Sequence, residues 1–147
     1  MAGKWPACPG DRAKSSYAYA KISAVLQAMR APERPCRQVR VDQVSGVTTL
    51  EVADDSGLAT DRDTSLTTGA PLREVYTIHP DDPLSARVEI WRRHQLSRDG
   101  WRVETETYVQ MTAAADSFFI AGDLRAPENG AFVTTRAWRS RHRRDFV

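Results

Sequence analysis

The sequence has little of several features that define common protein classes. It contains two cysteines, Cys8 and Cys36, which are too few for a disulfide framework and lack the paired CxxC spacing of a zinc or redox site. No apolar run approaches the roughly 18 residues of a membrane span, and residues 1–11 lack the apolar core of a signal peptide. These absences predict a soluble protein of the reducing cytoplasm with no membrane partner.

An excess of charge of one sign is also missing. The 21 Lys and Arg residues against 19 Asp and Glu give a net charge of +2, too small to attract nucleic acid or an anionic membrane. The one local concentration is the segment RAWRSRHRR at residues 136–144, where arginines beside an aromatic residue can contact phosphates and stack on a base. We favour a strand that leaves its sheet into a solvated tail, or an interface with another domain, and expect no nucleic-acid partner.

The length and composition favour one folded domain preceded by a leader. A chain of 147 residues that is 41% hydrophobic and 27% charged is ordinary for a globular protein. Residues 1–35 are interpreted as a leader with one short helix over residues 16–30, since four apolar residues there follow helical spacing: Ile22, Val25, Leu26 and Met29. The alternation of Tyr17 and Tyr19 leaves a strand open as the alternative.

After Pro35 the apolar residues alternate with polar ones, which is typical of β-strands. Residues 39–41 and 48–52 predict a hairpin around a turn at 43–46, and residues 53–71 are interpreted as a loop that holds a short strand and covers an edge or an end. Further strands are predicted at residues 74–79, 87–94, 101–110, 117–125 and 131–138. Their turns contain Pro-Asp-Asp-Pro, Asp-Gly and Asn-Gly. The sequence therefore predicts a mainly β fold over residues 36–147, an antiparallel β-sandwich or partial jelly roll.

The pattern also predicts which way individual side chains point. In the strand over residues 87–94, Val88 and Ile90 are expected to face one way and Glu89, Trp91 and Arg93 the other. We expect the aromatic residues to pack on the sheet; they are Trp91, Trp101, Tyr108, Phe118, Phe119, Phe132 and Trp138.

The serines do not form a recognisable nucleophile site. An α/β-hydrolase serine needs a sharp strand-to-helix turn, usually within GxSxG, and the chain has no such motif. Ser45 and Ser56 each precede a glycine but lie between predicted strands. We interpret both as solvated turn residues.

Three histidines, His79, His94 and His142, are candidates for acid–base or metal chemistry. His79 lies beside Asp81 and Asp82, which would suit a divalent metal or a relay, yet no second spaced ligand pair is visible. We favour a structural corner made of five residues: His79, Pro80, Asp81, Asp82 and Pro83. No catalytic residue, cofactor or metal is predicted.

Glu104 and Glu106 lie two residues apart on one predicted strand and so project from the same face. Paired carboxylates carry out acid–base catalysis in glycosidases, where the two usually come from different elements. We expect a solvated strand face instead.

Several motifs, taken in order, resemble one protein family. The segment REVYTIHPDDPLSAR at residues 73–87 is followed by WRVETET at 101–107, by residues 111–118, by Arg136-Ala137-Trp138 and by Arg144-Asp145. Over residues 39–147 this succession resembles the C-terminal region of CocE/NonD family hydrolases, relatives of Xaa-Pro dipeptidyl-peptidases and acyl esterases. His142 departs from that pattern, where an apolar residue is expected.

The resemblance implies a non-catalytic role. In that family an α/β-hydrolase domain carries the Ser-His-Asp machinery, and a jelly-roll-like β domain packs against it. The similarity covers the β portion only, so no catalytic residue is carried over. The resemblance implies an accessory β domain, present as a fragment or as a stand-alone chain, whose partner is an α/β-hydrolase domain or a second copy. The alternative is an independent small β module that binds a ligand or a protein.

Overall fold

The computed structural model describes residues 35–145, so the predicted helix at 16–30 lies outside the described residues. The described part contains nine strands: β1 Cys36–Val41, β2 Thr48–Asp54, β3 Ala59–Thr60, β4 Thr67–Gly69, β5 Leu72–His79, β6 Asp82–Arg98, β7 Trp101–Ala113, β8 Ser117–Glu128 and β9 Ala131–Arg143. Within this range the structure has no helix. In particular, no helix of this part is long and apolar enough to cross a membrane.

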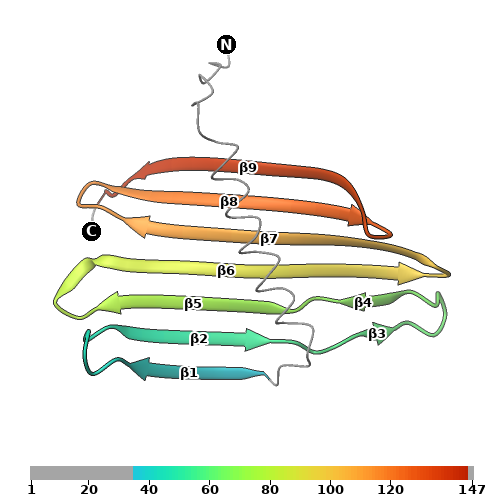
Figure 1. Ribbon diagram of the computed structural model, residues 1–147, viewed down its shortest axis with the longest axis horizontal. Helices are drawn as coiled ribbons and strands as arrows, with labels where there is room; N and C mark the ends of the chain where they lie inside the picture. Colours follow the sequence, from blue (N-terminus) through green and yellow to red (C-terminus); the bar gives the residue numbers. More distant parts are fainter. Residues whose placement is uncertain (1–34, 146–147) are drawn as a thin grey trace, which may run out of the picture.

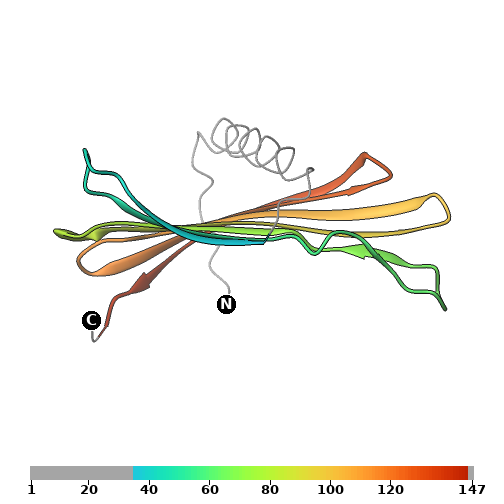
Figure 2. The same ribbon diagram turned by 90° about the horizontal axis from the view of Figure 1, so that it is seen from below.

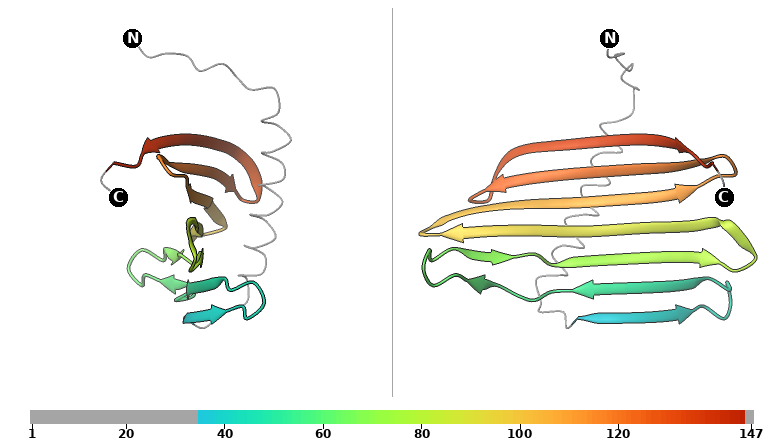
Figure 3. Two further views of the ribbon diagram at one scale, coloured as in Figure 1. Left: turned by 90° about the vertical axis from the view of Figure 1, so that its left-hand side faces the viewer. Right: turned by 180° about the vertical axis from the view of Figure 1, so that it is seen from behind.

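All nine strands belong to one open antiparallel sheet (Figure 1). Seven strands follow the order β1-β2-β5-β6-β7-β8-β9, and the short β3–β4 hairpin joins the sheet where β4 pairs with the end of β6. The strands lie in a single curved layer (Figure 3), and its twist makes the β1 and β9 edges cross in the view along the plane of the sheet (Figure 2). The predicted mainly β, antiparallel fold is confirmed, and one such layer is consistent with a sandwich-like fold.

Two tight turns fix the register of the long central strands. Asp99 and Gly100 have φ values of 51° and 79°, and Asn129 and Gly130 have 49° and 79°. Two consecutive left-handed residues are typical of the type I′ turns that match the twist of a hairpin. The Asp-Gly and Asn-Gly reversals predicted from the sequence are therefore confirmed.

Two strands extend further than the sequence pattern suggested. β6 already begins at Asp82, so the connection after β5 is a two-residue turn at Pro80 and Asp81. β9 continues to Arg143, which pairs with Ser117 of β8. The prediction that the chain leaves the sheet after residue 138 is therefore wrong. The neighbouring strand β8 offers backbone partners along that whole stretch, which local side-chain pattern does not reveal.

Candidate interaction surface

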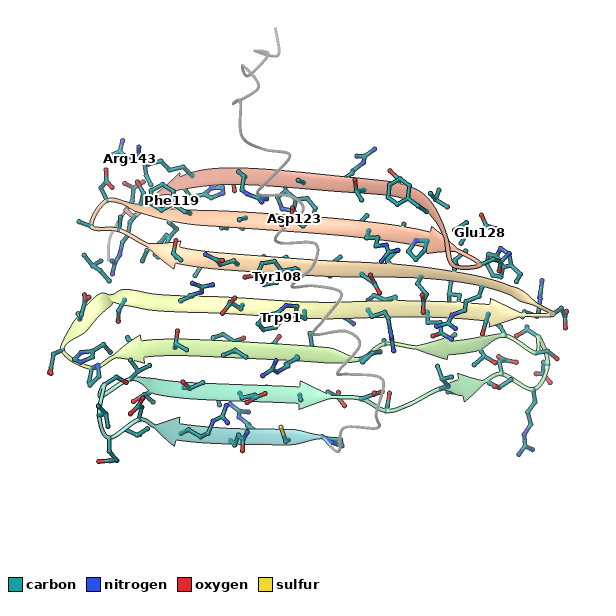
Figure 4. All side chains as sticks on the ribbon, in the orientation of Figure 1. Trp91, Tyr108, Phe119, Asp123, Glu128 and Arg143 are labelled. Atoms are coloured by element: carbon teal, nitrogen blue, oxygen red, sulfur yellow. The ribbon has the colours of Figure 1, made fainter. Side chains whose placement is uncertain are left out.

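The register divides the sheet into two faces of opposite character, because residues paired across strands point to the same side. We call one side the apolar face. It carries Val39, Val41, Leu50, Val52, Leu72, Tyr76, Ile78, Val88, Ile90, Leu96, Val103, Val109, Met111, Phe118, Ile120, Leu124 and Trp138. We call the other side the charged face. It carries Trp91 and Tyr108 among arginines and carboxylates (Figure 4).

The apolar face contains an uninterrupted row across six strands. Successive pairings align six apolar residues from β1 to β8: Val39, Leu50, Tyr76, Val88, Met111 and Ile120. We call this set the apolar row. Ile90 and Val109 form part of the next row, one step along the strands. Side chains on one face at this spacing form a continuous hydrophobic strip.

No member of the apolar row is buried. Among residues 35–145, only three hydrophobic side chains are buried, namely Ala53, Trp91 and Tyr108, and all three lie on the charged face. Val39 is 65% exposed, and Ile78 and Trp138 of the same face are about 40% exposed. The other five members of the row are half-buried, so the row keeps only part of its apolar surface accessible. A contiguous apolar surface that stays accessible is typical of an interaction site in soluble proteins.

Gly122 and Trp138 shape the β8–β9 part of the apolar face. They are directly paired, and a Cβ on Gly122 would meet the Trp138 indole more closely than real Cβ contacts allow. The Trp138 indole therefore occupies the space beside the Gly122 backbone that a side chain at position 122 would need.

On the charged face, Glu51 joins three strands. Its carboxylate accepts hydrogen bonds from Arg40 of β1 at 2.7 Å and from Arg73 of β5 at 2.7 Å. Burial raises the pKa of Glu51, but the Arg73 bond and the other donors outweigh that effect and leave the pKa below its usual value. The Arg73 guanidinium also lies 5.4 Å from the centre of the Trp91 ring. These contacts hold β1, β2, β5 and β6 together.

A second polar network lies at the centre of the charged face. The Tyr108 hydroxyl donates to Glu89 at 2.6 Å, and Arg87 donates to the same Glu89 oxygen at 2.9 Å. Burial, together with the Glu89 hydrogen bond, raises the pKa of Tyr108 to about 12. The Tyr108 ring is 5.3 Å from that of Trp91 between centroids. These contacts hold β6 and β7 together at the centre of the charged face.

Three of the five arginines in residues 136–144 lie beside carboxylates. Arg139 contacts Asp123 at 3.3 Å, and Arg141 contacts Asp116 at 2.8 Å. Arg143 lies 3.4 Å from Asp145. These carboxylates offset part of the positive charge of the segment, to which Arg136 and Arg144 also contribute.

The structure does not assemble a nucleophile site around the two candidate serines. Ser45 lies in the β1–β2 turn, where its hydroxyl accepts from the Val47 backbone, and Ser56 lies exposed beside the Asp55–Gly57 turn. The Gly46 backbone approaches the His79 ring. His79 Nδ1 accepts a hydrogen bond from the Asp81 backbone N–H. The neutral ring therefore carries its proton on Nε2, and this nitrogen has no lone pair with which to accept a proton from the Ser45 hydroxyl.

The five residues of the predicted corner lie at the β5–β6 connection. The His79 backbone donates to the Ser85 hydroxyl at 2.7 Å, and that hydroxyl donates to the Asp82 carbonyl at 2.6 Å. His94 and His142 are on β6 and β9, apart from this connection. Within residues 35–145 no group of three or more His, Cys, Asp or Glu residues is arranged to hold a metal ion.

Two expectations about side chains need correction. Glu104 and Glu106 do share the charged face, but their side chains are only 15% and 12% exposed and pair with Arg102 and Arg125 instead of facing solvent. Long arginine side chains from the same and the neighbouring strand lie over them. The expectation that all the aromatic residues pack on the sheet is also wrong, because Phe132 is 61% exposed.

Comparison with known proteins finds no matching family model, no similar curated protein and no similar solved structure. The candidate site therefore rests on the geometry of the sheet. Sequence reasoning placed the apolar residues on strands and expected an apolar face that meets another domain, but only the register shows which residues of 35–145 form that face. The available signal was that every long strand contributes apolar residues to the same side.

Proposed function

We propose that this chain is a non-catalytic accessory β domain whose apolar face packs against another protein layer. The observation that carries the proposal is the apolar row, which crosses six strands without one buried member. In a sandwich, such a row faces a second layer at a distance of about 10 Å. The charged face, in contrast, is stabilised by ion pairs between its own residues.

The motif resemblance supports a parent family. The segment at residues 73–87 and the motifs after it resemble the β domain of CocE/NonD hydrolases, in which a separate α/β-hydrolase domain carries the catalytic serine. On this proposal the chain contributes structure and contact surface to such a hydrolase, and any ester or peptide hydrolysis belongs to the partner domain.

The test combines activity and binding. We expect the purified chain to be inert toward p-nitrophenyl esters and to remain unlabelled by a serine-directed phosphonate. We also expect it to bind a CocE/NonD-type catalytic domain purified without its own β domain, as measured by calorimetry, and Val88→Lys to abolish that binding. Stoichiometric labelling of one serine would refute the non-catalytic role.

A shallow hollow, lined mainly by charged-face residues of β7, β8 and β9, favours the alternative of an independent ligand-binding module. It has a volume of about 770 Å³ and is lined by Gln110, Thr112, Phe119, Ile120, Ala121, Arg139, Ser140 and Arg141. An exposed aromatic ring beside two guanidinium groups suits a small aromatic carboxylate. Benzoate should then shift the NMR signals of these residues in the wild type and not in Phe119→Ala; unchanged wild-type spectra at millimolar benzoate exclude this alternative.

A further inference from the structure

We infer that the protein layer on the apolar face is a second copy of this chain, so that two sheets form one sandwich across a two-fold axis. This inference rests on the proposed function, because it concerns the same face: a second copy covers that face where no hydrolase domain is bound, and a bound hydrolase domain would replace it. A two-fold interface requires a surface that is complementary to itself. A broad row of apolar side chains on a pleated sheet meets that requirement, because the inner faces of two sheets interdigitate.

The size of the face is sufficient for a stable dimer. The apolar side chains extend over seven strands and about three rows, which corresponds to roughly 650 Å² of sheet on each copy at ordinary strand spacings. Two copies would bury about 1,300 Å², within the range of specific protein interfaces. A smaller patch would leave only a weak encounter.

The edges of the sheet disfavour the competing way for copies to associate. The edge strands β1 and β9 contain two and four arginines and no acidic residue. Pairing of β9 with β9 of another copy, or with β1, would bring arginines of both copies together, and the neighbouring carboxylates offset that repulsion only in part. Charge therefore directs self-association away from the edges and toward the face.

The charges on the apolar face lie mostly away from the apolar row. Glu74 and Arg37 are in one neighbouring row, on either side of Val52. The Glu74 carboxylate accepts a hydrogen bond from Tyr76 at 2.9 Å. Arg92 and His94 lie further along β6, toward its C-terminal end. The part of the face that holds the apolar row is thus the part that a second copy would cover.

The test is the mass of the full 147-residue chain by sedimentation velocity between 1 and 100 μM. We expect a species of two 16.5-kDa chains. Met111→Lys, in the centre of the apolar row, should weaken dimerisation about 100-fold, because it places an unpaired charge in the interface. The matched control is Thr112→Lys, the next residue on the same strand but on the charged face, which should dimerise like the wild type.

Circular dichroism and a cooperative melt show that each variant is folded, and Val39→Lys serves as a second variant because Val39 is already 65% exposed. A folded monomer over the whole concentration range, or a dimer unaffected by both variants, overturns the inference. These results separate it from the proposed function. If the wild type is a monomer that binds the dye ANS and Met111→Lys does not bind it, the apolar face is free, and only the dimer inference fails. If the wild-type monomer binds no ANS, the apolar face is not free, and both the dimer inference and the proposed function fail.

Discussion

The two faces of the sheet are built from the same strands, yet they differ in how they are stabilised. The charged face contains all three buried hydrophobic side chains of residues 35–145 together with the Glu51 and Tyr108 networks. The apolar face contains most of the hydrophobic strand residues and buries none of the apolar row. One face is thus completed by contacts within the described residues, whereas the other keeps apolar surface that those residues do not cover. The difference places the packed contacts and the uncovered apolar surface on opposite sides of one sheet.

The strongest contrast is expected between two adjacent residues that point to opposite faces. Trp91→Ala should destabilise the chain by about 3–5 kcal/mol, because it removes the largest buried hydrophobic side chain. Ile90→Ala should cost only about 1 kcal/mol in the monomer, since Ile90 is already partly exposed. Urea unfolding at low concentration measures both. Equal losses would mean that the apolar face is covered within the chain.

Glu51 tests whether the ion pairs of the charged face stabilise the sheet. Glu51→Gln should cost about 2 kcal/mol, because it removes the charge that Arg40 and Arg73 share. The folded-state pKa of Glu51 is lowered, so its contribution is present above the unfolded pKa near 4.5 and is lost as the pH falls through the folded value. Thermal melts between pH 7 and pH 3 should show this loss in the wild type and a smaller loss in Glu51→Gln. An identical pH dependence would show that the carboxylate contributes nothing.

Tyr108 should make the folded chain sensitive to high pH. The folded pKa of about 12 lies above the unfolded value of 10, so the protonated hydroxyl stabilises the fold fully below pH 10, and this contribution is lost as the pH rises toward 12. Tyr108→Phe should cost about 1–1.5 kcal/mol at neutral pH, because the bond to Glu89 is lost. The variant should also lose stability less steeply above pH 10. Tyr76→Phe on the opposite face is the comparison, because the hydrogen bond to Glu74 raises the pKa of Tyr76 as well.

The smallest effect is expected at the rim of the charged face. Arg143 is 87% exposed beside Asp145, and such solvated ion pairs contribute little. Arg143→Ala should therefore change the free energy of unfolding by less than about 0.5 kcal/mol. If Arg143→Ala lowered the free energy of unfolding as much as Glu51→Gln, exposed ion pairs at the rim would stabilise the sheet as much as the half-buried ones at its centre.

Local sequence pattern determined the elements of the fold. Alternation of apolar and polar residues identified the long strands and the opposite directions of Ile90 and Trp91, because side chains alternate with every residue of a strand. The Asp-Gly and Asn-Gly pairs identified two hairpins, since their left-handed backbone is accessible to few residue types. These features depend on neighbours within a few residues, and so they can be read from the chain alone.

Only the tertiary structure decided how the strands are completed. Three features depend on the register between strands. They are the continuation of β9 to Arg143, the contact of Glu51 with both Arg40 and Arg73, and the pairing of Glu106 with Arg125. The same holds for the exposure of the apolar row. Alternation shows that a strand has an apolar side, but whether a second layer covers that side depends on contacts between distant parts of the chain or with another chain.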